Sequence, residues 1–317
     1  MRIVFAGTPE PAVVALEKLI ASKHEVVAVI TRPDARRGRG RTLHPSPVKE
    51  LAQKHGIEVL TPSTLKPGTE DGEALRARLR DLSPEAIPVV AYGSLITPDL
   101  LDLPRHGWVN LHFSLLPAWR GAAPVQAAIA AGDEVTGATT FRIDKGLDTG
   151  VILGTLEEKI QATDTADDLL TRLAYAGGDL LVETMDGLAA GTITPHEQSG
   201  EPSYAHKIAV EDARVNWQDS AEAIDRHIRA HTPAPGAWTM LGEERVKLGP
   251  VSLIGVDPAL EGVALAPGEA HITKKSVYVG TADAAVKLER LQVPGKKMMN
   301  AADWARGLGG NKEVRFS

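Results

Sequence analysis

The sequence predicts an α/β protein: a parallel-rich sheet wrapped by helices, followed by a smaller barrel of short strands. In the first part, apolar runs alternate with helical patterns, which is typical of a parallel sheet covered by helices. Beyond Lys207 the strands become short and are broken by Gly and Pro at regular intervals, which favours a small barrel or sandwich. A length of 317 residues suits two domains better than one core.

Short apolar runs bounded by turn residues mark the strands of the first part. The first of them, Arg2–Ala6, is expected to be a buried strand. In chain order, the expected strands are Arg2–Ala6, Glu25–Ile30, Ile57–Leu60, Ala86–Ala91 and Trp108–Leu111, followed by a late hairpin of Gly137–Ile143 and Val151–Ile160.

Helices are expected between these strands, and two of them carry clear start signals. Ser46 followed by Pro47 is typical of a cap residue with proline at the first helical position. Residues 164–168 place carboxylates at the positive end of a later helix. The expected helices begin at Pro9 or Glu10 and at Ser46–Pro47, and span Asp71–Leu82, Pro124–Ala131 and Thr165–Ala189.

The composition changes near Gly191, where Thr, Pro, Gly, Ser and Gln dominate. We expect residues 190–206 to be a linker, which leaves residues 1–189 and 207–317 as the two domains. The second domain is expected to contain the helices Ala221–Ala230 and Ala301–Gly307 and the strands Arg245–Leu248, Gly262–Leu265, Val277–Gly280 and Ala285–Val293.

The bulk composition excludes several classes of protein. Apolar residues make up 43% and charged residues 24% of the chain, as in ordinary soluble proteins. The absence of cysteine excludes disulfides, thiolate metal sites and cysteine nucleophiles, and it fits a reducing cytoplasm. The apolar run at the N-terminus meets Gly7 and Pro9 too early for a signal peptide. No stretch approaches the roughly 18 apolar residues of a membrane span. We therefore expect a cytoplasmic protein without a membrane partner.

Basic residues are concentrated locally although the net charge is −6. The segment R-P-D-A-R-R-G-R-G-R contains five arginines, and guanidinium groups suit phosphate recognition better than ammonium groups do. We favour RNA contact over a simple solvated loop for this segment. Residues 207–317 hold 15 Lys and Arg against 14 Asp and Glu. This domain could present a basic face formed by Lys207, Arg214, Arg229, Lys296 and Lys297. Because acidic residues surround them, an ordinary solvated surface is an almost equally favoured interpretation.

Three side chains suited to acyl transfer occur close together between Val109 and Gly150. Asn110 and His112 are two residues apart, so on an extended strand they point the same way. An amide and an imidazolium on one side can hold the oxygen of a tetrahedral intermediate. Asp148, in D-K-G-L-D-T-G, could orient that imidazole and favour its charged form. The alternative is that each side chain merely satisfies neighbouring backbone groups.

The sequence lacks the motifs typical of a serine nucleophile, a nicotinamide cofactor or a metal site. No G-x-S-x-G elbow occurs near these three, so direct transfer is favoured over a covalent acyl-enzyme. The first turn, F-A-G-T-P-E, lacks G-x-G-x-x-G, and a proline stands where a glycine should approach a pyrophosphate. We therefore expect no nicotinamide cofactor. Without H-x-x-x-H or H-E-x-x-H, no metal site is expected either.

Motifs over nearly the whole length resemble the methionyl-tRNA formyltransferase family. N-L-H-x-S-L-L-P and G-L-D-T-G are shared by all 10-formyltetrahydrofolate-dependent transformylases, whereas P-S-P-V-K, Y-A-H-K-I and the second domain narrow the resemblance to the tRNA enzymes. The chain departs from the pattern at Phe113, where a small residue is usual, and at Ala118, where arginine is common. Phe113 could narrow the folate pocket, and Ala118 removes one candidate tRNA contact.

The resemblance implies a Rossmann-like catalytic domain and an OB-like C-terminal domain that binds tRNA. It also implies formyl transfer from 10-formyltetrahydrofolate, as co-substrate, to the α-amine of methionyl-initiator-tRNA by a monomer. Asn110, His112 and Asp148 would be the catalytic residues. The folate set it implies is Tyr92, Gly93, Ser114, Leu115, Leu116, Pro117, Asp144 and Gly146. The tRNA set is Arg36, Arg37, Arg39, Arg41, Lys49 and Lys207.

Two other functions remain open from the residues. One is a transformylase acting on a small amine, such as a ribonucleotide or an amino sugar. The other is a non-catalytic tRNA-binding module with a degenerate fold, which the intact set of three catalytic types disfavours.

Overall fold

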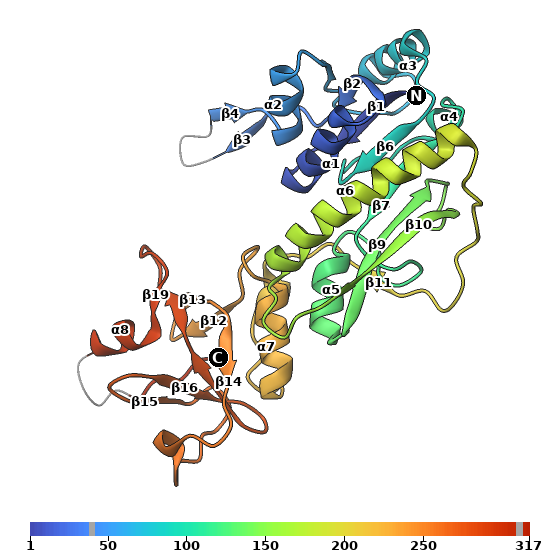
Figure 1. The fold of residues 1–317 in the computed structure, drawn as a ribbon. Coiled ribbons are helices and arrows are strands. Elements are labelled where there is room, and N and C mark those ends of the chain that lie inside the picture. Colours follow the sequence, from blue (N-terminus) through green and yellow to red (C-terminus); the bar gives the residue numbers. More distant parts are fainter. Residues whose placement is uncertain (38–41, 309–312) are drawn as a thin grey trace. The chain divides into compact units, whose positions relative to one another are not determined.

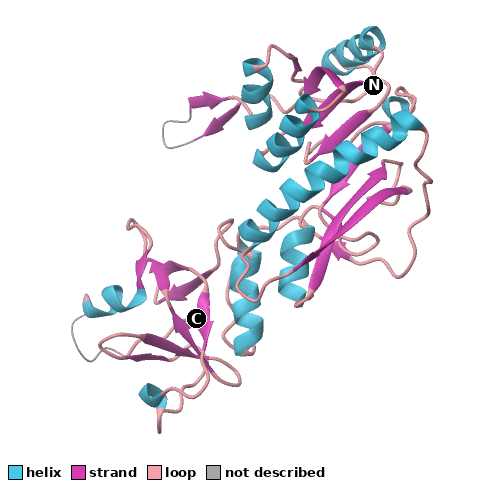
Figure 2. Cartoon of the chain, in the orientation of Figure 1, coloured by secondary structure: helices cyan, strands magenta, loops and turns pink. Residues whose placement is uncertain are grey.

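The computed structural model describes residues 1–37, 42–308 and 313–317 (Figure 1). Two compact units interleave along the chain. Unit 1 comprises residues 1–121, 135–159 and 170–204, and unit 2 comprises residues 122–134, 160–169 and 205–317. The simple division expected at residues 190–206 stays a prediction. Helices and strands alternate through unit 1 and strands dominate unit 2 (Figure 2).

Unit 1 is built on a seven-stranded sheet of order β10-β9-β7-β6-β1-β2-β5. The five strands from β7 to β5 in that order are parallel, and β9 runs antiparallel to both of its neighbours. The predicted parallel-rich sheet is therefore confirmed, with the late hairpin as its antiparallel edge. The strands are β1 (Arg2–Gly7), β2 (Glu25–Ile30), β5 (Glu58–Leu60), β6 (Ile87–Val90), β7 (Trp108–His112), β9 (Val135–Arg142) and β10 (Ile152–Lys159).

Helices pack on the sheet of unit 1. Val4 and Ala6 of β1 share a buried cluster with Leu75 and Leu79 of α3. The long helix α6 packs closely on β7, because a Cβ at Gly177 would lie 3.1 Å from both terminal carbons of Leu111. The helices of this sheet region are α1 (Glu10–Ala21), α2 (Pro47–Lys54), α3 (Glu70–Leu82), α4 (Pro98–Leu101) and α6 (Ala166–Ala190).

Two small paired elements complete this part of the chain. The strands β3 (Ala35–Arg37) and β4 (Thr42–His44) form an antiparallel pair within the basic segment. The strands β8 (Arg120–Gly121) and β11 (Tyr204–Ala205) form a second pair. No helix in the described ranges is long and apolar enough to cross a membrane.

Unit 2 contains two antiparallel four-stranded sheets, β12-β13-β18-β19 and β14-β17-β16-β15. Their buried faces share one apolar core that includes Trp217, Val246, Val279 and Phe316. The strands are β12 (Trp238–Leu241), β13 (Glu244–Leu248), β14 (Val251–Leu253), β15 (Ala270–Ile272), β16 (Val277–Gly280), β17 (Ala285–Leu288), β18 (Arg290–Gln292) and β19 (Met299–Asn300). Its helices are α5 (Pro124–Ala131), α7 (Ala221–Ala230) and α8 (Ala301–Arg306), with single 3₁₀ turns at Glu211–Ala213 and Pro258–Leu260.

Two strand predictions in unit 2 need correction. Gly262–Leu265 is not a strand, because the amide of Val263 donates to the carbonyl of Leu260 in a turn rather than to a neighbouring strand. The run Ala285–Val293 is two strands that separate at Glu289 and enter different sheets. Apolar residues recur from one end of this run to the other, so the sequence pattern did not separate the two strands.

Candidate active site

The candidate site lies at the carboxyl end of β7. Asn110 is half-buried and His112 is 6% exposed. Both pair with β9, at Phe141 and Thr139 respectively. Alternation along a strand places the two side chains on one face of the sheet, as the spacing predicted.

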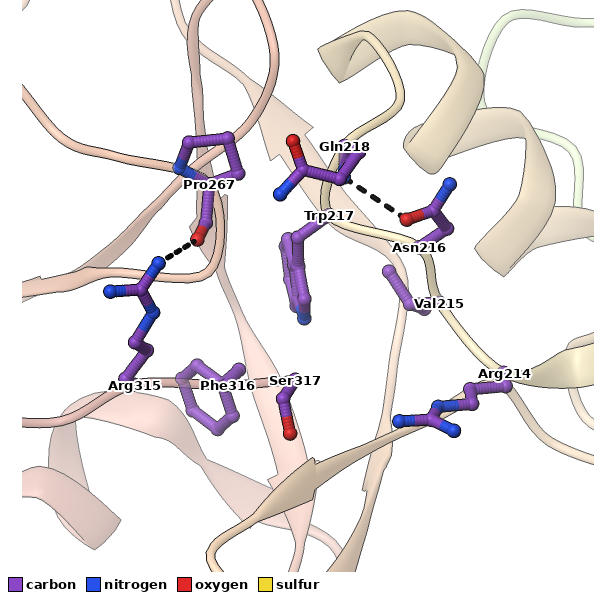
Figure 3. Close-up of a pocket in the computed structure, with 9 residues that line it drawn as sticks. All are labelled: Arg214, Val215, Asn216, Trp217, Gln218, Pro267, Arg315, Phe316 and Ser317. Atoms are coloured by element: carbon purple, nitrogen blue, oxygen red, sulfur yellow. Dashed lines mark hydrogen bonds between the residues drawn. The ribbon is translucent and has the colours of Figure 1, made fainter.

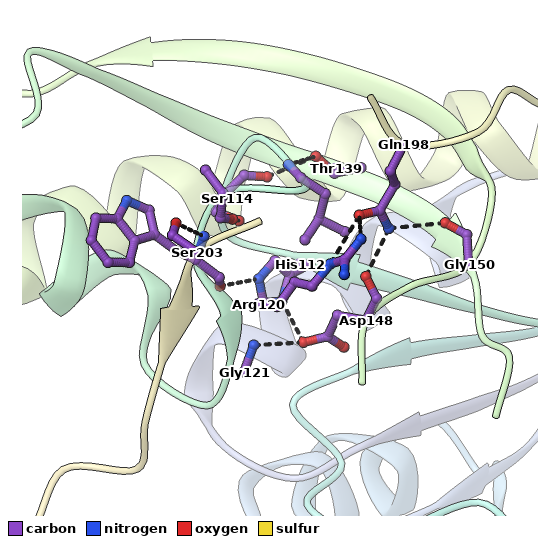
Figure 4. A network of polar contacts seen from close by, with 12 residues as sticks. His112, Ser114, Arg120, Gly121, Thr139, Asp148, Gly150, Gln198 and Ser203 are labelled. Atoms are coloured by element: carbon purple, nitrogen blue, oxygen red, sulfur yellow. Dashed lines mark hydrogen bonds and ion pairs between the residues drawn. The ribbon is translucent and has the colours of Figure 1, made fainter. Parts of the chain in front are cut away.

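Two oxygens face the imidazole of His112 (Figure 4). Its Nε2 lies 2.9 Å from the carbonyl oxygen of Trp119, which fits a hydrogen bond donated by an N–H at this nitrogen. Its Nδ1 lies 3.8 Å from Oδ2 of Asp148, which is too long for a hydrogen bond but close enough for strong electrostatic coupling. The structure therefore brings His112 and Asp148 together across 36 residues of sequence.

The backbone at both partners of His112 is unusual. Trp119 has φ of 57° and Asp148 has φ of 52°, which are left-handed values that non-glycine residues rarely adopt. The amide of Gly121 donates to Oδ2 of Asp148 at 2.7 Å. A Cβ at Gly150 would overlap the carbonyl oxygen of Arg142, so only glycine fits at that end of the loop. Strained residues held by such bonds are concentrated at functional sites.

The charge of His112 is set by opposing influences. Burial lowers the pKa of His112 below 6.5, while the Asp148 carboxylate and the Trp119 carbonyl act to raise it. Burial prevails, so the imidazole is neutral at pH 7 in the free protein. The sequence led us to expect a charged imidazole, because it gave no measure of how completely the ring is buried.

Two residues of the expected linker hold the site together, and the sequence did not single them out. Gln198 Nε2 donates to the carbonyls of Asp148 at 2.7 Å and Gly150 at 3.0 Å. The hydroxyl of Ser203 accepts from the amide of Trp119 at 2.8 Å. A turn-like composition gives no signal for contacts so distant in sequence.

The expected folate residues fall into two structural groups. Ser114 is fully buried, and its hydroxyl donates to the carbonyl of Ala118 at 2.5 Å. Leu116 and Pro117 follow in this turn, which is bound to β9 because Oγ1 of Thr139 accepts from the Leu116 amide at 3.2 Å. The two departures from the family pattern also lie here: Phe113 is buried, and Ala118 contributes its carbonyl. In this group the backbone rather than the Ser114 side chain is available to shape a pocket.

The other expected folate residues lie on neighbouring loops. Asp144 Oδ1 accepts from the amide of Gly146 at 2.9 Å and from the hydroxyl of Thr149 at 2.7 Å, which closes the loop that carries Asp148. Tyr92 follows β6 and is 3% exposed, and this burial raises the pKa of its phenol to about 12. The phenol therefore stays protonated.

The expected tRNA residues lie at several places. Arg36 and Arg37 are on β3, where they pair with Leu43 and Thr42 of β4. Arg39 and Arg41 lie outside the described residues. Lys49 belongs to α2, and its ammonium lies 2.7 Å from Asp34. Lys207 is exposed in unit 2.

Unit 2 holds a pocket of about 300 Å³ (Figure 3). None of the expected catalytic, folate or tRNA residues lines it, but Arg214, considered for a basic face, does. The guanidinium of Arg214, at its edge, lies 5.5 Å from the ring of Trp238. Arg229, considered for the same basic face, is instead 7% exposed and is bound to Asp225 at 2.8 Å. The lining residues are Arg214, Val215, Asn216, Trp217, Gln218, Pro267, Arg315, Phe316 and Ser317.

Carboxylates and histidines form no metal-binding cluster within the part of the chain that the structure describes. The arrangement at His112 instead offers a half-buried amide, a buried imidazole and a carboxylate on one side of a sheet. Such a set can stabilise negative charge on a carbonyl oxygen and accept or donate a proton.

Comparison with known families identifies the class to which this fold and site belong. The formyl transferase family matches residues 1–185, and the formyl transferase C-terminal domain matches residues 207–309. A methionyl-tRNA formyltransferase of Corynebacterium aurimucosum is 71% identical over 100% of both chains. One of Rhodococcus erythropolis is 56% identical over 99% of both chains. The chain therefore belongs to the formyl transferase family, among its methionyl-tRNA formyltransferases.

Solved structures with low sequence identity share the fold. WlaRD, a sugar 3N-formyl transferase crystallised with dTDP and 5-N-formyl-THF, is 18% identical with a TM-score of 0.63, over 94% of this chain and 99% of that one. A methionyl-tRNA formyltransferase from Clostridium thermocellum is 18% identical with a TM-score of 0.55, over 80% of this chain and 94% of that one.

Proposed function

We propose that this chain transfers the formyl group of 10-formyltetrahydrofolate to the α-amino group of methionyl-initiator-tRNA. The observation that carries the proposal is the His112–Asp148 pair at the end of β7, on the same strand face as Asn110. The full-length similarity to methionyl-tRNA formyltransferases supports this acceptor over a small amine or a purely RNA-binding role.

In the first chemical step, the neutral α-amine attacks the formyl carbon and a carbon–nitrogen bond forms. Negative charge develops on the formyl oxygen. We assign Asn110 as one hydrogen-bond donor, and His112 as a second donor once its Nδ1 has taken up a proton, because a neutral ring whose Nε2–H is given to Trp119 has no proton at Nδ1. The Nε2 proton of His112 is already donated to the Trp119 carbonyl, so Nδ1, held 3.8 Å from Asp148, is the nitrogen left to serve the reaction.

Collapse of the intermediate breaks the bond between the formyl carbon and the folate nitrogen. The attacking nitrogen loses a proton and the folate nitrogen gains one. Asp148 lies where it stabilises positive charge on His112 as this proton moves, and a water held by its carboxylate completes the relay. No covalent enzyme intermediate is needed.

The proposed binding residues are those that the resemblance to methionyl-tRNA formyltransferases implies. The turn of Ser114, Leu115, Leu116 and Pro117, with Tyr92, Gly93, Asp144 and Gly146, forms the proposed folate pocket. Arg36, Arg37, Arg39, Arg41, Lys49 and Lys207 are the proposed phosphate contacts. We further propose a monomer that acts in the cytoplasm, with residues 1–189 catalytic, residues 190–206 a linker and residues 207–317 binding tRNA.

Acceptor competition tests the proposal. Purified protein is given labelled formyl donor together with charged initiator tRNA, charged elongator tRNA, glycinamide ribonucleotide or an amino-sugar nucleotide. We expect rapid formylation of charged initiator tRNA and much slower transfer to the others. Faster transfer to a small amine would contradict the assigned acceptor, and tRNA binding without transfer would identify a non-catalytic module.

A further inference from the structure

Gln198 lies at a crossing of two chain segments that each hold one partner of His112 (Figure 4). Its Nε2 donates to the carbonyls of Asp148 and Gly150, at 2.7 and 3.0 Å. Its Oε1 accepts from Nε and Nη2 of Arg120, at 3.1 and 2.6 Å. One carboxamide therefore binds the loop that carries Asp148 to the segment that carries Trp119.

These contacts fix the orientation of the carboxamide. A flipped amide would set its NH₂ against a guanidinium and its oxygen against two carbonyl oxygens, so only the observed assignment satisfies all four bonds. Arg120 thereby keeps both N–H groups of Gln198 directed at the Asp148 loop.

A second residue of the same segment supports the other partner of His112. The hydroxyl of Ser203 accepts from the Trp119 amide at 2.8 Å, and the carbonyl of Ser203 accepts from the Arg120 amide at 2.8 Å. Residues 198–203, which we call the strap, thus bind both the loop that carries Asp148 and the segment that carries Trp119. In these interactions neither Gln198 nor Ser203 contacts His112 itself.

We propose that Gln198 is a positioning residue for formyl transfer, which holds the backbone of Asp148 so that its carboxylate stays within reach of His112. This inference rests on the proposed function. Asp148 has a left-handed φ of 52°, a conformation that persists only where surrounding bonds over-determine it. The Gly121 amide fixes one carboxylate oxygen, and Gln198 fixes the peptide carbonyl of the same residue.

The geometry explains why such support matters for the rate. Nδ1 of His112 and Oδ2 of Asp148 are 3.8 Å apart, so a small backbone shift decides whether a direct hydrogen bond can form when the ring takes up a proton. A displacement of about 1 Å at a reacting group costs up to about 100-fold in rate. Substrate affinity is expected to change little, because Gln198 reaches the reaction only through Asp148.

The substitution Gln198→Glu removes the two positioning bonds and adds a negative charge, so Gln198→Met, which removes the bonds without adding a charge, is made alongside it. Glutamate has the same length and still accepts from Arg120, but it cannot donate to the two carbonyls. We expect kcat to fall about 10- to 100-fold, while KM for the folate donor and for charged tRNA stays within about twofold. Glu197→Gln, at the exposed neighbouring position, is the matched control and should keep the parent kcat.

A double-mutant cycle with Asp148→Asn separates positioning from general support of the fold. If Gln198 acts through Asp148, then Gln198→Glu lowers kcat far less in the Asp148→Asn background than in the parent. Equal losses in both backgrounds, a parent-like kcat for Gln198→Glu, or a rise in KM with unchanged kcat would each overturn the proposal. Gln198→Met, which lacks both donors and carries no charge, is carried through the same cycle and should show the same coupling to Asp148→Asn. Failure of the parent protein to formylate charged tRNA would instead reject the proposed function.

Discussion

Asn110 and His112 illustrate how much a two-residue spacing can convey when it falls at the end of a buried strand. The alternation of side chains along β7 was enough to place both on one face. Asp148 was predicted to belong to the site because of its residue type and its glycine-flanked loop. Gln198 and Ser203 were not predicted, because they lie in a segment whose composition indicates only a linker. Their roles come from contacts with residues dozens of positions away in the sequence.

Asn110 is expected to act on charge that appears only during the reaction. Asn110→Ala should lower kcat about 100- to 1,000-fold, the usual cost of losing one oxyanion donor, with little change in folate affinity. Single-turnover formylation with saturating charged tRNA measures this. Gln218→Ala, which removes a carboxamide in unit 2, is the matched control. An Asn110→Ala variant that folds and turns over normally would remove this residue from the mechanism.

The Lys49–Asp34 pair makes the proposed tRNA contact of Lys49 testable in two directions. Its distance of 2.7 Å shows that the ammonium is partly neutralised before any phosphate arrives. Lys49→Ala should weaken tRNA binding and flatten its salt dependence. Asp34→Asn should do the opposite, because it frees the ammonium and removes a negative charge.

Titration of charged-tRNA binding at several salt concentrations measures both variants. Equal effects of the same sign would show that the pair serves the fold of this segment and not RNA recognition.

Among the elements, the parallel strands were predictable because each is a short, mainly apolar run bounded by turn residues. β7 was predicted to within one residue of its observed end. The strands of unit 2 were harder. β12, β14 and β15 are only three or four residues long and were not predicted, since runs so short carry little periodicity. The segment 262–265, wrongly predicted as a strand, is apolar enough, but the amide of Val263 donates to Leu260 in a local turn.

The start of α2 was predicted from Ser46 and Pro47, and its energetics follow from the observed cap. Ser46 Oγ accepts from the Lys49 amide at 3.0 Å and also lies 2.6 Å from the hydroxyl of Thr31. Ser46→Ala should lower the free energy of unfolding by about 1 kcal/mol or more, since an N-cap is lost and a buried hydroxyl loses its partner.

Urea denaturation of the two proteins measures this loss. Thr69→Ala, at the more exposed cap of α3, is the comparison and should cost less. A greater loss for Thr69→Ala would contradict the role assigned to the Thr31–Ser46 contact.

For the whole molecule, four histidines give the stability a defined pH dependence. Burial is the largest cause that lowers the pKa of His24, His106, His112 and His227 below 6.5. In the unfolded chain these groups bind protons near pH 6.5, whereas the folded protein binds them only at lower pH. The unfolded state therefore binds more protons in that window, and stability rises with pH there.

We accordingly expect the unfolding temperature to decrease steadily as the pH falls from about 7.5 to 5.5. Carboxylates with a lowered pKa, such as Asp99, add to the loss only at more acidic pH. Thermal unfolding at several pH values and constant ionic strength measures the trend. A constant or rising unfolding temperature in this window would contradict the burial assigned to these rings.

The central claim is that His112 and Asp148 form the working pair of a formyl transfer site. The most direct test compares kcat for charged initiator tRNA in the parent protein, His112→Ala, Asp148→Ala and the double variant, with folding checked by circular dichroism. Each single variant should lose at least about 100-fold, and the double variant should lose little more than the worse single one, because the two side chains act as a unit. Parent-like turnover in either folded single variant would contradict the account.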